Sequence, residues 1–390
     1  MTTWAVRSAT DDDQQAMSRL AATGFGVYMA PESKRPWRVM VADGGSVVVS
    51  DGPEIVGMAC YLDMELTVPG GVTLPIAGVS AVVVSPTHRR RGILRAMVTD
   101  LHRRIEATGA PIAALTASEG GIYGRFGYGP ATIERSMVVQ RRLAEFHADA
   151  PDDGRVRLVA PAQHRDQLME IYDRWRRRTP GGLACPQVLW DDVLADRDSD
   201  RDGGSAWFAL LHPDGYALYR VRHGDKAVVR TGVTAVTPQA HAALWRTLLG
   251  LDLIDEVQID THPADPLPYL LADSRRVQTT SMVDALWLRI MDIPAALQAR
   301  TYPADAHLVL EVGDGRFALD ISGGRATCVP TDAPADLHLD LDVLGSIYLG
   351  THSARDLAAA NRIRSASDEA LYMADAAFRS TVPAQMGFHF

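Results

Sequence analysis

Lysine is almost absent from this sequence of 390 residues: it occurs only as Lys34 and Lys226, and the other basic side chains are arginine. Acidic residues still outnumber basic ones, which leaves a formal net charge of −9 at pH 7. Proteins that bind nucleic acid need a positive face, so this balance predicts no nucleic acid as a partner. An acidic surface concentrates cations around it, which favours a cationic substrate.

Cysteine is also scarce. Cys60, Cys185 and Cys328 lie far apart in the sequence and form no CxxC pair. A sparse, odd set of this kind predicts reduced thiols in a cytosol. The histidines and acidic residues show no spacing typical of a metal site, so we expect no metal.

Long apolar runs are missing too. No stretch reaches the roughly 18 residues that a membrane span requires, so we expect no membrane partner. The first residues, 1–13, are polar and acidic and lack the apolar core of a signal peptide. These features predict a cytoplasmic protein and leave open an export that uses no signal peptide.

What is present is typical of a globular protein, with 47% hydrophobic and 22% charged residues. Strand and helix patterns alternate throughout, which predicts a mixed α/β (α+β) fold. The segment 147–153, with Pro151 followed by two aspartates, has the composition of a linker, and the element pattern divides the chain into three regions. We expect domains at 1–148, 149–290 and 291–390.

The first region contains a strand, a helix and a second strand in succession. Val79–Val84 is a nearly continuous apolar run, as expected of a buried central strand. Apolar residues then recur at helical spacing through Gly92–Thr108, and Ile112–Thr116 is the next predicted strand. Further strands are predicted at 47–50, 55–62, 65–68 and 72–77.

The second and third regions mix both types of element. The second has predicted helices at 163–177, 187–195 and 238–249, and predicted strands at 206–211, 217–221, 227–234 and 256–261. The third has predicted strands at 307–312, 316–321 and 335–340. One predicted helix begins near Pro294. Others are predicted at 343–349, at 354–361 and after Asp368.

The turn between the apolar strand and the helix is rich in arginine. It reads Arg89-Arg90-Arg91-Gly92-Ile93-Leu94-Arg95. A helix N-terminus has unpaired N–H groups and a partial positive charge, which suit a bound anion. Arginines there oppose the helix dipole unless an anion binds, and Gly92 allows close approach of a phosphate. A solvated basic turn is the alternative interpretation.

A second segment, 117–130, follows the strand Ile112–Thr116. It contains five glycines together with Tyr123, Phe126 and Tyr128. Such a segment predicts tight backbone geometry and a nearby ligand; the alternative is a loop packed by its own aromatic side chains. The sequence also ends on Phe388-His389-Phe390 without a polar tail, which predicts a buried terminus.

Together these motifs resemble a known family. Arg89-Arg90-Arg91-Gly92 resembles the acetyl-CoA signature of GNAT acetyltransferases, although Leu94 replaces its usual small last residue. The strings PTHRRRG and ASEGGIYGRFGYGPAT closely resemble the Eis (enhanced intracellular survival) acetyltransferases, and further matches cover nearly the whole chain. The resemblance implies tandem GNAT-like domains followed by a sterol-carrier-protein-like domain, and a homohexamer. It also implies acetyl transfer to amines such as aminoglycosides, polyamines or lysine side chains.

The same resemblance implies roles for individual residues. Tyr123 would be the general acid and the C-terminal carboxylate of Phe390 the general base. The implied acetyl-CoA contacts are Val82, Val83, Val84, Arg90, Arg91, Gly92, Ile93, Leu94, Arg95, Ser118 and Glu119.

These roles agree with ordinary chemistry. A Tyr hydroxyl, with a pKa of roughly 10, can donate its proton to a departing thiolate. A free α-carboxylate titrates near about 3.5, so it becomes a useful base only if burial raises its pKa.

The chain also departs from its tuberculosis-type relatives in the acceptor pocket. Val27 stands where those relatives have an acidic residue, His389 replaces a penultimate Glu, and Thr116 replaces a His. Phe25 and Trp37 remain as expected aromatic walls. Losing two carboxylates makes aminoglycoside acetylation a weaker expectation than acetyl transfer itself.

The second region shows no arginine-glycine turn, the nearest candidate being 233–238, so we expect it not to bind CoA. Two other functions stay open on the sequence alone. The C-terminal region would bind a lipid in a carrier protein whose GNAT part is vestigial. In a structural oligomer, the arginines would bind phosphate without catalysis.

Overall fold

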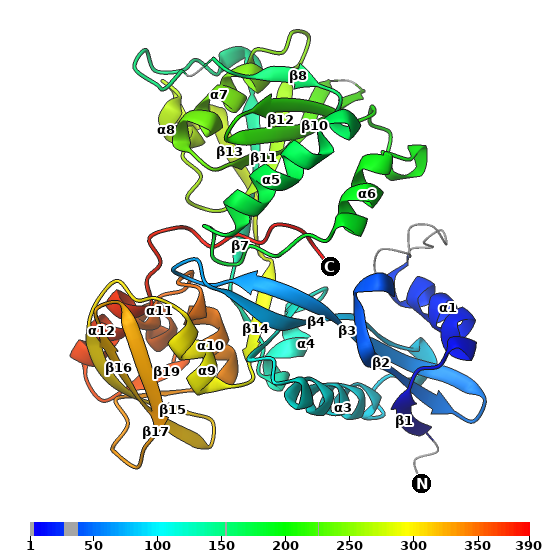
Figure 1. Cartoon of the computed structure of the whole chain (residues 1–390), viewed down its shortest axis with the longest axis vertical. Coiled ribbons are helices and arrows are strands. Elements are labelled where there is room, and N and C mark those ends of the chain that lie inside the picture. Colours follow the sequence, from blue (N-terminus) through cyan, green and yellow to red (C-terminus); the bar gives the residue numbers. More distant parts are fainter. Residues whose placement is uncertain (1–3, 27–37, 153, 225) are drawn as a thin grey trace. The chain divides into compact units, whose positions relative to one another are not determined.

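The computed structural model describes residues 4–26, 38–152, 154–224 and 226–390. They form two compact units, each built from separate stretches of chain (Figure 1). The first comprises the described parts of 1–131 with 286–381 and 388–390; the second comprises 132–285 and 382–387. The contiguous boundaries expected after 148 and 290 stay predictions, whereas the compact units change at 131/132 and 285/286.

A seven-stranded sheet organises the described N-terminal part of the first unit. Its order is β1-β2-β3-β4-β5-β14-β6, and only β4 and β5 run parallel. The strands span Trp4–Ser8 (β1), Val41–Asp51 (β2), Glu54–Thr67 (β3), Thr73–Val84 (β4), Ile112–Thr116 (β5), Leu286–Ile290 (β14) and Gly129–Pro130 (β6). The predicted strands 72–77 and 79–84 are one continuous strand, β4, at the centre of the sheet.

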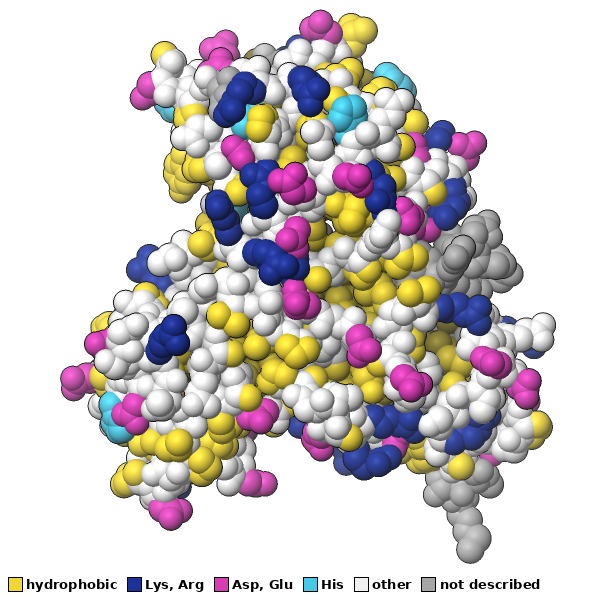
Figure 2. Space-filling model, in the orientation of Figure 1, with side chains coloured by type: hydrophobic (Ala, Val, Ile, Leu, Met, Phe, Trp, Pro, Cys, Tyr) yellow, Lys and Arg dark blue, Asp and Glu magenta, His cyan; other side chains and the backbone are white. Residues whose placement is uncertain are grey.

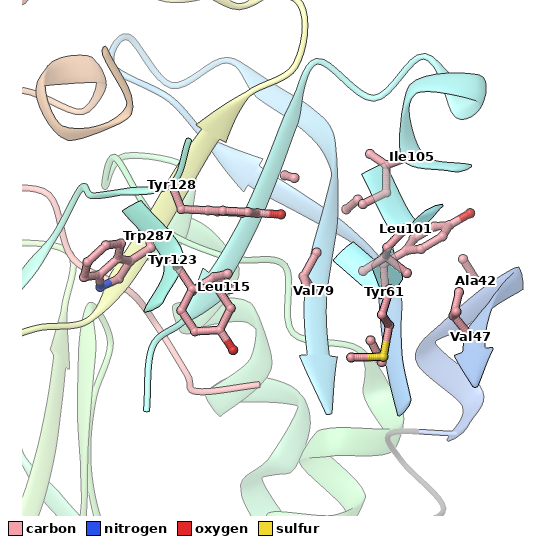
Figure 3. Packing of buried hydrophobic residues seen from close by; sticks show 14 of the residues in the cluster. Ala42, Val47, Tyr61, Val79, Leu101, Ile105, Leu115, Tyr123, Tyr128 and Trp287 are labelled. Carbon is pink, nitrogen blue, oxygen red and sulfur yellow. The ribbon is translucent and has the colours of Figure 1, made fainter. Parts of the chain in front are cut away.

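Two helices cover opposite faces of this sheet. Period-2 alternation along β2 sends Val47 and Val49 into the core under α3 (Ile93–Thr108), and Val48 into the core under α1 (Gln14–Phe25). The α3 core also contains Met97, Leu101, Ile105, Leu115 and Tyr123, and Figure 3 shows how several of these side chains pack. The predicted helix 92–108 is therefore present, and most of its apolar face is buried.

The second unit contains another seven-stranded sheet, in the order β13-β7-β12-β11-β10-β9-β8. Its strands are β7 (Ile133–Gln140), β8 (Arg157–Val159), β9 (Phe208–His212), β10 (Gly215–His223), β11 (Ala227–Ala235), β12 (Glu256–Thr261) and β13 (Val277–Asp284). Its helices are α5 (Arg165–Arg176), α6 (Gln187–Ala195), α7 (Pro238–Leu249) and α8 (Leu267–Leu270). The predictions missed β7, β8 and β13.

The C-terminal part of the first unit has a five-stranded sheet, β17-β16-β15-β18-β19. These strands span β15 (Ala306–Val312), β16 (Gly315–Ser322), β17 (Arg325–Pro330), β18 (Leu337–Leu339) and β19 (Ile363–Ser365). Its helices are α9 (Ile293–Ala299), α10 (Leu341–Tyr348), α11 (Ala354–Ala359) and α12 (Asp368–Phe378). No described helix is both long and apolar enough to cross a membrane.

A buried arginine connects the helices of this C-terminal part. Arg300 is 1% exposed, and its guanidinium donates to the carbonyls of Tyr348 and Phe378, the last residues of α10 and α12. Both carbonyls lie at helix C-termini, where a cation is favourable. The guanidinium also lies 4.7 Å from the ring centre of Tyr302.

Candidate functional site

The site begins where β4 and β5 separate. The two strands pair only at Ala77 with Ala113 and Gly78 with Ala114. Beyond these pairs β4 continues along β3 and β5 continues along β14. A bulge lies in the separated part of β4, with Ala81 in the left-handed region at φ 53°. A bulge leaves backbone groups out of the strand ladder, so they can bind a ligand.

A cavity of about 250 Å³ lies in this opening. It is lined by residues of both strands, by the last residue of α1, by the segment that follows β5, and by the chain end: Phe25, Val79, Ser80, Ala81, Val82, Leu115, Thr116, Ala117, Ser118, Tyr123, His389 and Phe390. Residues distant in sequence that were predicted as site residues, among them Val82, Ser118, Tyr123 and Phe390, therefore meet at one place.

The arginine-rich turn directly follows β4. A short 3₁₀ helix (Pro86–His88) leads into it, Arg90 and Gly92 have positive φ of 62° and 82°, and α3 begins at Ile93. Gly92 is the N-cap and offers no side chain to the first turn of α3. The N–H groups of that turn are therefore left for another acceptor.

The arginines of this turn lack acidic partners. Among the described residues, no hydrogen bond or ion pair occupies the guanidinium of Arg89, Arg90, Arg91 or Arg95, and all four are exposed. Several other arginines of the first unit do pair with an acid, for example Arg104 with Asp100 at 2.7 Å. Figure 2 shows basic side chains gathered over the region of α3. This arrangement favours the interpretation as an anion-binding site over that of a solvated basic turn.

Tyr123 is positioned by its short helix and its aromatic neighbours. It ends α4 (Gly120–Tyr123), is 7% exposed, and packs edge-on against Tyr128 with ring centres 6.2 Å apart. In Figure 3 it lies beside Leu115 of β5. Burial raises the pKa of the Tyr123 phenol, and the negative charge of Glu119 raises it further. The phenol is therefore protonated at neutral pH and can act as a donor.

Phe390 lies between the separated strands. A Cβ built on Gly78 of β4 would come within 3.0 Å of its ring, so the ring packs where β4 lacks a side chain. On the other side, the Thr116 hydroxyl of β5 donates to the main-chain O of Phe390 at 3.1 Å. Sequence reasoning missed Gly78 and noted Thr116 only as a departure from relatives, because no local pattern reveals a contact with the chain end.

The other predicted residues have separate positions. Phe25 and His389 line the cavity, with Phe25 51% exposed. Val83 points to the α1 side of the sheet, where it packs with Met17 and Leu20. Ile93, the first residue of α3, is buried in the core between that helix and the sheet. Glu119 precedes α4 as its N-cap. The predicted pocket residues Val27 and Trp37 lie outside the described residues.

The glycine-rich segment does more packing than the sequence suggested. A Cβ on Gly129 would clash with the backbone O of Asp342, and one on Gly345 would clash with the backbone O of Leu288. Helix α10 therefore packs directly against β6 and β14 through two glycines. Gly127, with φ 81°, faces the Arg289 guanidinium. Within the segment 117–130, Gly127 and Gly129 therefore allow close packing within the first unit.

The corresponding turn of the second unit is built differently. Between β11 and α7 the chain has neither arginine nor glycine, only Val236 and Thr237. Thr237 caps α7, because its hydroxyl accepts from the Ala240 N–H at 3.2 Å, and Pro238 occupies the first turn. The N-terminus of α7 thus satisfies itself and offers little to an anion.

Comparison with known proteins finds a separate domain match in each of the three predicted regions of the chain. Residues 5–131 and 181–290 each match a GNAT acetyltransferase domain model, and residues 293–386 match a sterol carrier protein domain model. The N-acetyltransferase Eis of Mycobacterium tuberculosis (strain H37Ra) is 56% identical over an alignment of 396 positions that covers 98% of each chain. The chain belongs to the Eis family of N-acetyltransferases. An uncharacterized N-acetyltransferase of Streptomyces avermitilis is 37% identical, with 97% of each chain covered.

Solved structures agree with this Eis-family assignment. The crystal structure of Eis1 from Mycobacterium abscessus superimposes with a TM-score of 0.88 at 32% identity, and covers 99% of this chain and 100% of that chain. The predicted family, the N-acetyltransferase class and the fold of tandem GNAT domains with a sterol-carrier-like domain are confirmed.

One cavity of the C-terminal domain of this Eis-family chain is polar. A cavity of about 360 Å³ on its sheet is lined mainly by charged and polar side chains, including Glu311, His338, Asp340, Arg362 and Arg364. Within it Glu311 pairs with His338 at 2.7 Å. A lipid site would instead be lined by apolar side chains.

Proposed function

We propose that this Eis-family N-acetyltransferase transfers the acetyl group of acetyl-CoA to a primary amine of a cationic acceptor. The acceptor class comprises aminoglycosides, polyamines and lysine side chains, and the net charge of −9 favours such cations. The observation that carries the proposal is the cavity between β4 and β5, which Tyr123 and Phe390 both line. The turn that follows β4 adds to it, because its arginines have no acidic partner among the residues that the structure describes.

The residues present fit acetyl-CoA. We assign its phosphates to Arg90, Arg91, Arg95 and the N–H groups of Gly92, Ile93 and Leu94. In this turn, guanidinium groups that have no acidic partner among the described residues lie next to a glycine with open space around it. The backbone of Val82, Val83 and Val84 and the start of the next segment at Ser118 and Glu119 would hold the rest. When bound, acetyl-CoA supplies a thioester that an amine can attack.

The protein moves two protons in this scheme. The acceptor amine, in its neutral form after an ammonium proton has passed to solvent, forms a bond to the acetyl carbon while the carbon–sulfur bond breaks. The Phe390 carboxylate accepts the proton that the amine nitrogen loses, and Tyr123 donates its proton to the departing sulfur. The raised pKa of Tyr123 keeps that proton available. Backbone groups at the Ala81 bulge, which lines the cavity, would polarise the thioester carbonyl.

The test is a CoA-release assay with acetyl-CoA and a panel of aminoglycosides, polyamines and lysine peptides. We expect release with at least one polyamine or aminoglycoside. No release with any amine, together with no acetyl-CoA binding by calorimetry, would contradict the proposal. We also propose the homohexamer that the family resemblance implies, which light scattering on the eluted protein would check.

A further inference from the structure

The hydroxyl of Thr116 makes an unusual contact for the end of a strand. Thr116 is the last residue of β5 and pairs through its backbone with Leu286 of β14. Its side chain does not bond within the sheet but donates to the O of Phe390 at 3.1 Å. Valine has the same shape and high strand propensity, so the sheet itself does not need this hydroxyl.

Phe390 is held from two sides by this contact and by Gly78. Its ring fills the space above Gly78 of β4, next to Met64, while Thr116 of β5 holds its main-chain oxygen. The ring contact fixes where the residue lies, and the hydroxyl contact selects one oxygen. A hydroxyl that donates to a carboxylate also favours the ionised form of that carboxylate.

We propose that Thr116 is a positioning residue for the general base: its hydroxyl holds one carboxylate oxygen of Phe390, which leaves the other to accept the proton of the acceptor amine. This inference rests on the proposed function. The titratable groups that line the same cavity are Tyr123, from α4, and His389, beside Phe390. The residues that β4 contributes, from Val79 to Val82, carry no titratable group.

The test compares Thr116→Val, which keeps the shape, with Thr116→Ser, which keeps the hydroxyl. For Thr116→Val we expect kcat to fall about tenfold with the KM for acetyl-CoA within twofold of wild type, since a hydrogen bond to a charged group is lost. The acidic limb of the kcat profile should move to higher pH by about half to one pH unit. Thr116→Ser should restore both, and using one acceptor throughout cancels its own titration.

A second arm places Thr116→Val in a chain extended past Phe390 by two glycines, with the intact mass confirming each chain end. The extension removes the carboxylate from Phe390, so Thr116→Val should add no further loss there. Equal loss with and without the extension, or a Thr116→Ser variant as impaired as Thr116→Val, would assign Thr116 a structural role and overturn the inference. An unchanged pH profile in Thr116→Val would also overturn the inference about Thr116, but it would leave the Phe390 carboxylate as the proposed general base. Full turnover by the extended chain would instead contradict the role of that carboxylate as the base.

Should Thr116→Val lower the melting temperature by more than a few degrees, Thr116→Ala is measured beside it. A shift of the acidic limb in both variants supports positioning, because reduced folding lowers the amplitude of a profile and not its midpoint. A lower amplitude with an unmoved midpoint in both would overturn the inference.

Discussion

Helices α3 and α7 occupy similar places in two GNAT-like domains, yet their N-termini differ. α3 begins at Ile93, and its N-cap, Gly92, has no side chain to cap the first turn. The four exposed arginines around it lack acidic partners among the described residues. α7 begins with Thr237 as its own cap and with Pro238 in its first turn. One helix end is left open to an anion, and the other is satisfied by the chain itself. If the proposed acetyl-CoA site is correct, it depends on a few residues of one turn and not on the GNAT fold alone.

The parallel strands beside these helices also differ, because those of the first unit separate and those of the second unit stay paired. β4 and β5 share two residue pairs and separate at a bulge, whereas β11 and β12 share four pairs and the β10–β11 register runs without a break. The opening in the first sheet contains the cavity that Tyr123 and Phe390 line. The variants below test whether function follows these local differences.

Removing one hydroxyl in the first unit should have the largest effect. Tyr123→Phe should lower kcat about a hundredfold, because the departing sulfur loses its proton donor, with little change in acetyl-CoA affinity. The matched control is Tyr219→Phe on β10, which is also buried and should leave kcat within twofold. CoA-release kinetics measure both, and equal rates for Tyr123→Phe and wild type would remove the assigned role.

Charge at the open helix end comes next. The double variant Arg91→Ala and Arg95→Ala should raise the KM for acetyl-CoA about tenfold to a hundredfold while kcat changes less than threefold, because phosphate contacts are lost. The control Arg222→Ala and Arg230→Ala removes the same charge from the second unit, where both arginines pair with aspartates. If both double variants raise KM equally, the general charge of the protein, and not the turn, attracts acetyl-CoA.

Acid should weaken the first unit through a histidine on α3. His102 is partly buried against the Tyr128 hydroxyl at 3.0 Å, and burial, with Arg289 nearby, lowers its pKa to about 4. The unfolded value is roughly 6.5, so this contribution to stability is complete above pH 6.5 and is lost as the pH falls toward 4. At pH 5 the loss should be about 2 kcal/mol.

Urea unfolding of wild type and His102→Gln at pH 7.5 and pH 5 measures this effect, since Gln can still bond Tyr128 but does not titrate. On α7, His241 faces a carboxylate, Asp265, at 3.3 Å, so His241→Gln is the matched control and should not relieve the acid loss. Identical acid losses in wild type and His102→Gln would contradict the assignment.

The two helix caps should give the smallest effects, and of different kinds. Thr237→Ala should cost about 1 kcal/mol of unfolding free energy and leave the KM for acetyl-CoA unchanged. Gly92→Ala should cost a similar amount through backbone strain alone, because φ is 82° and nothing lies within 4 Å of the added Cβ. Only Gly92→Ala should also raise KM; a rise in Thr237→Ala would show that α7 contributes to binding.

Much of the first unit was predictable because its signals are local. Apolar runs and helical spacing located β4, α3 and β5, and the order of these elements located the arginine turn. The missed strands depend on distant partners. β14 was assigned by its position in the sequence to the second region, but it pairs with β5 and β6. β13 is largely exposed and polar, so its alternation gives no apolar face to recognise.

The candidate site shows the same limit. Tyr123 and Phe390 were expected from the resemblance, whereas the contacts that hold Phe390 were not. Thr116 and Gly78 reach it across 274 residues or more of sequence, and neither residue type is unusual in a strand. Gly129 looked like a ligand-binding glycine, but its missing side chain makes room for α10.

The position of β14 between β5 and β6 has a consequence for synthesis. On a ribosome, β5 emerges long before Leu286, and at ordinary elongation rates the delay is on the order of ten seconds. During that time the nascent first sheet has an open edge along β5, and such an edge can pair with other chains. A stalled or truncated chain that ends before β14 should therefore aggregate, or be retained by chaperones, even though it carries the whole arginine turn and Tyr123.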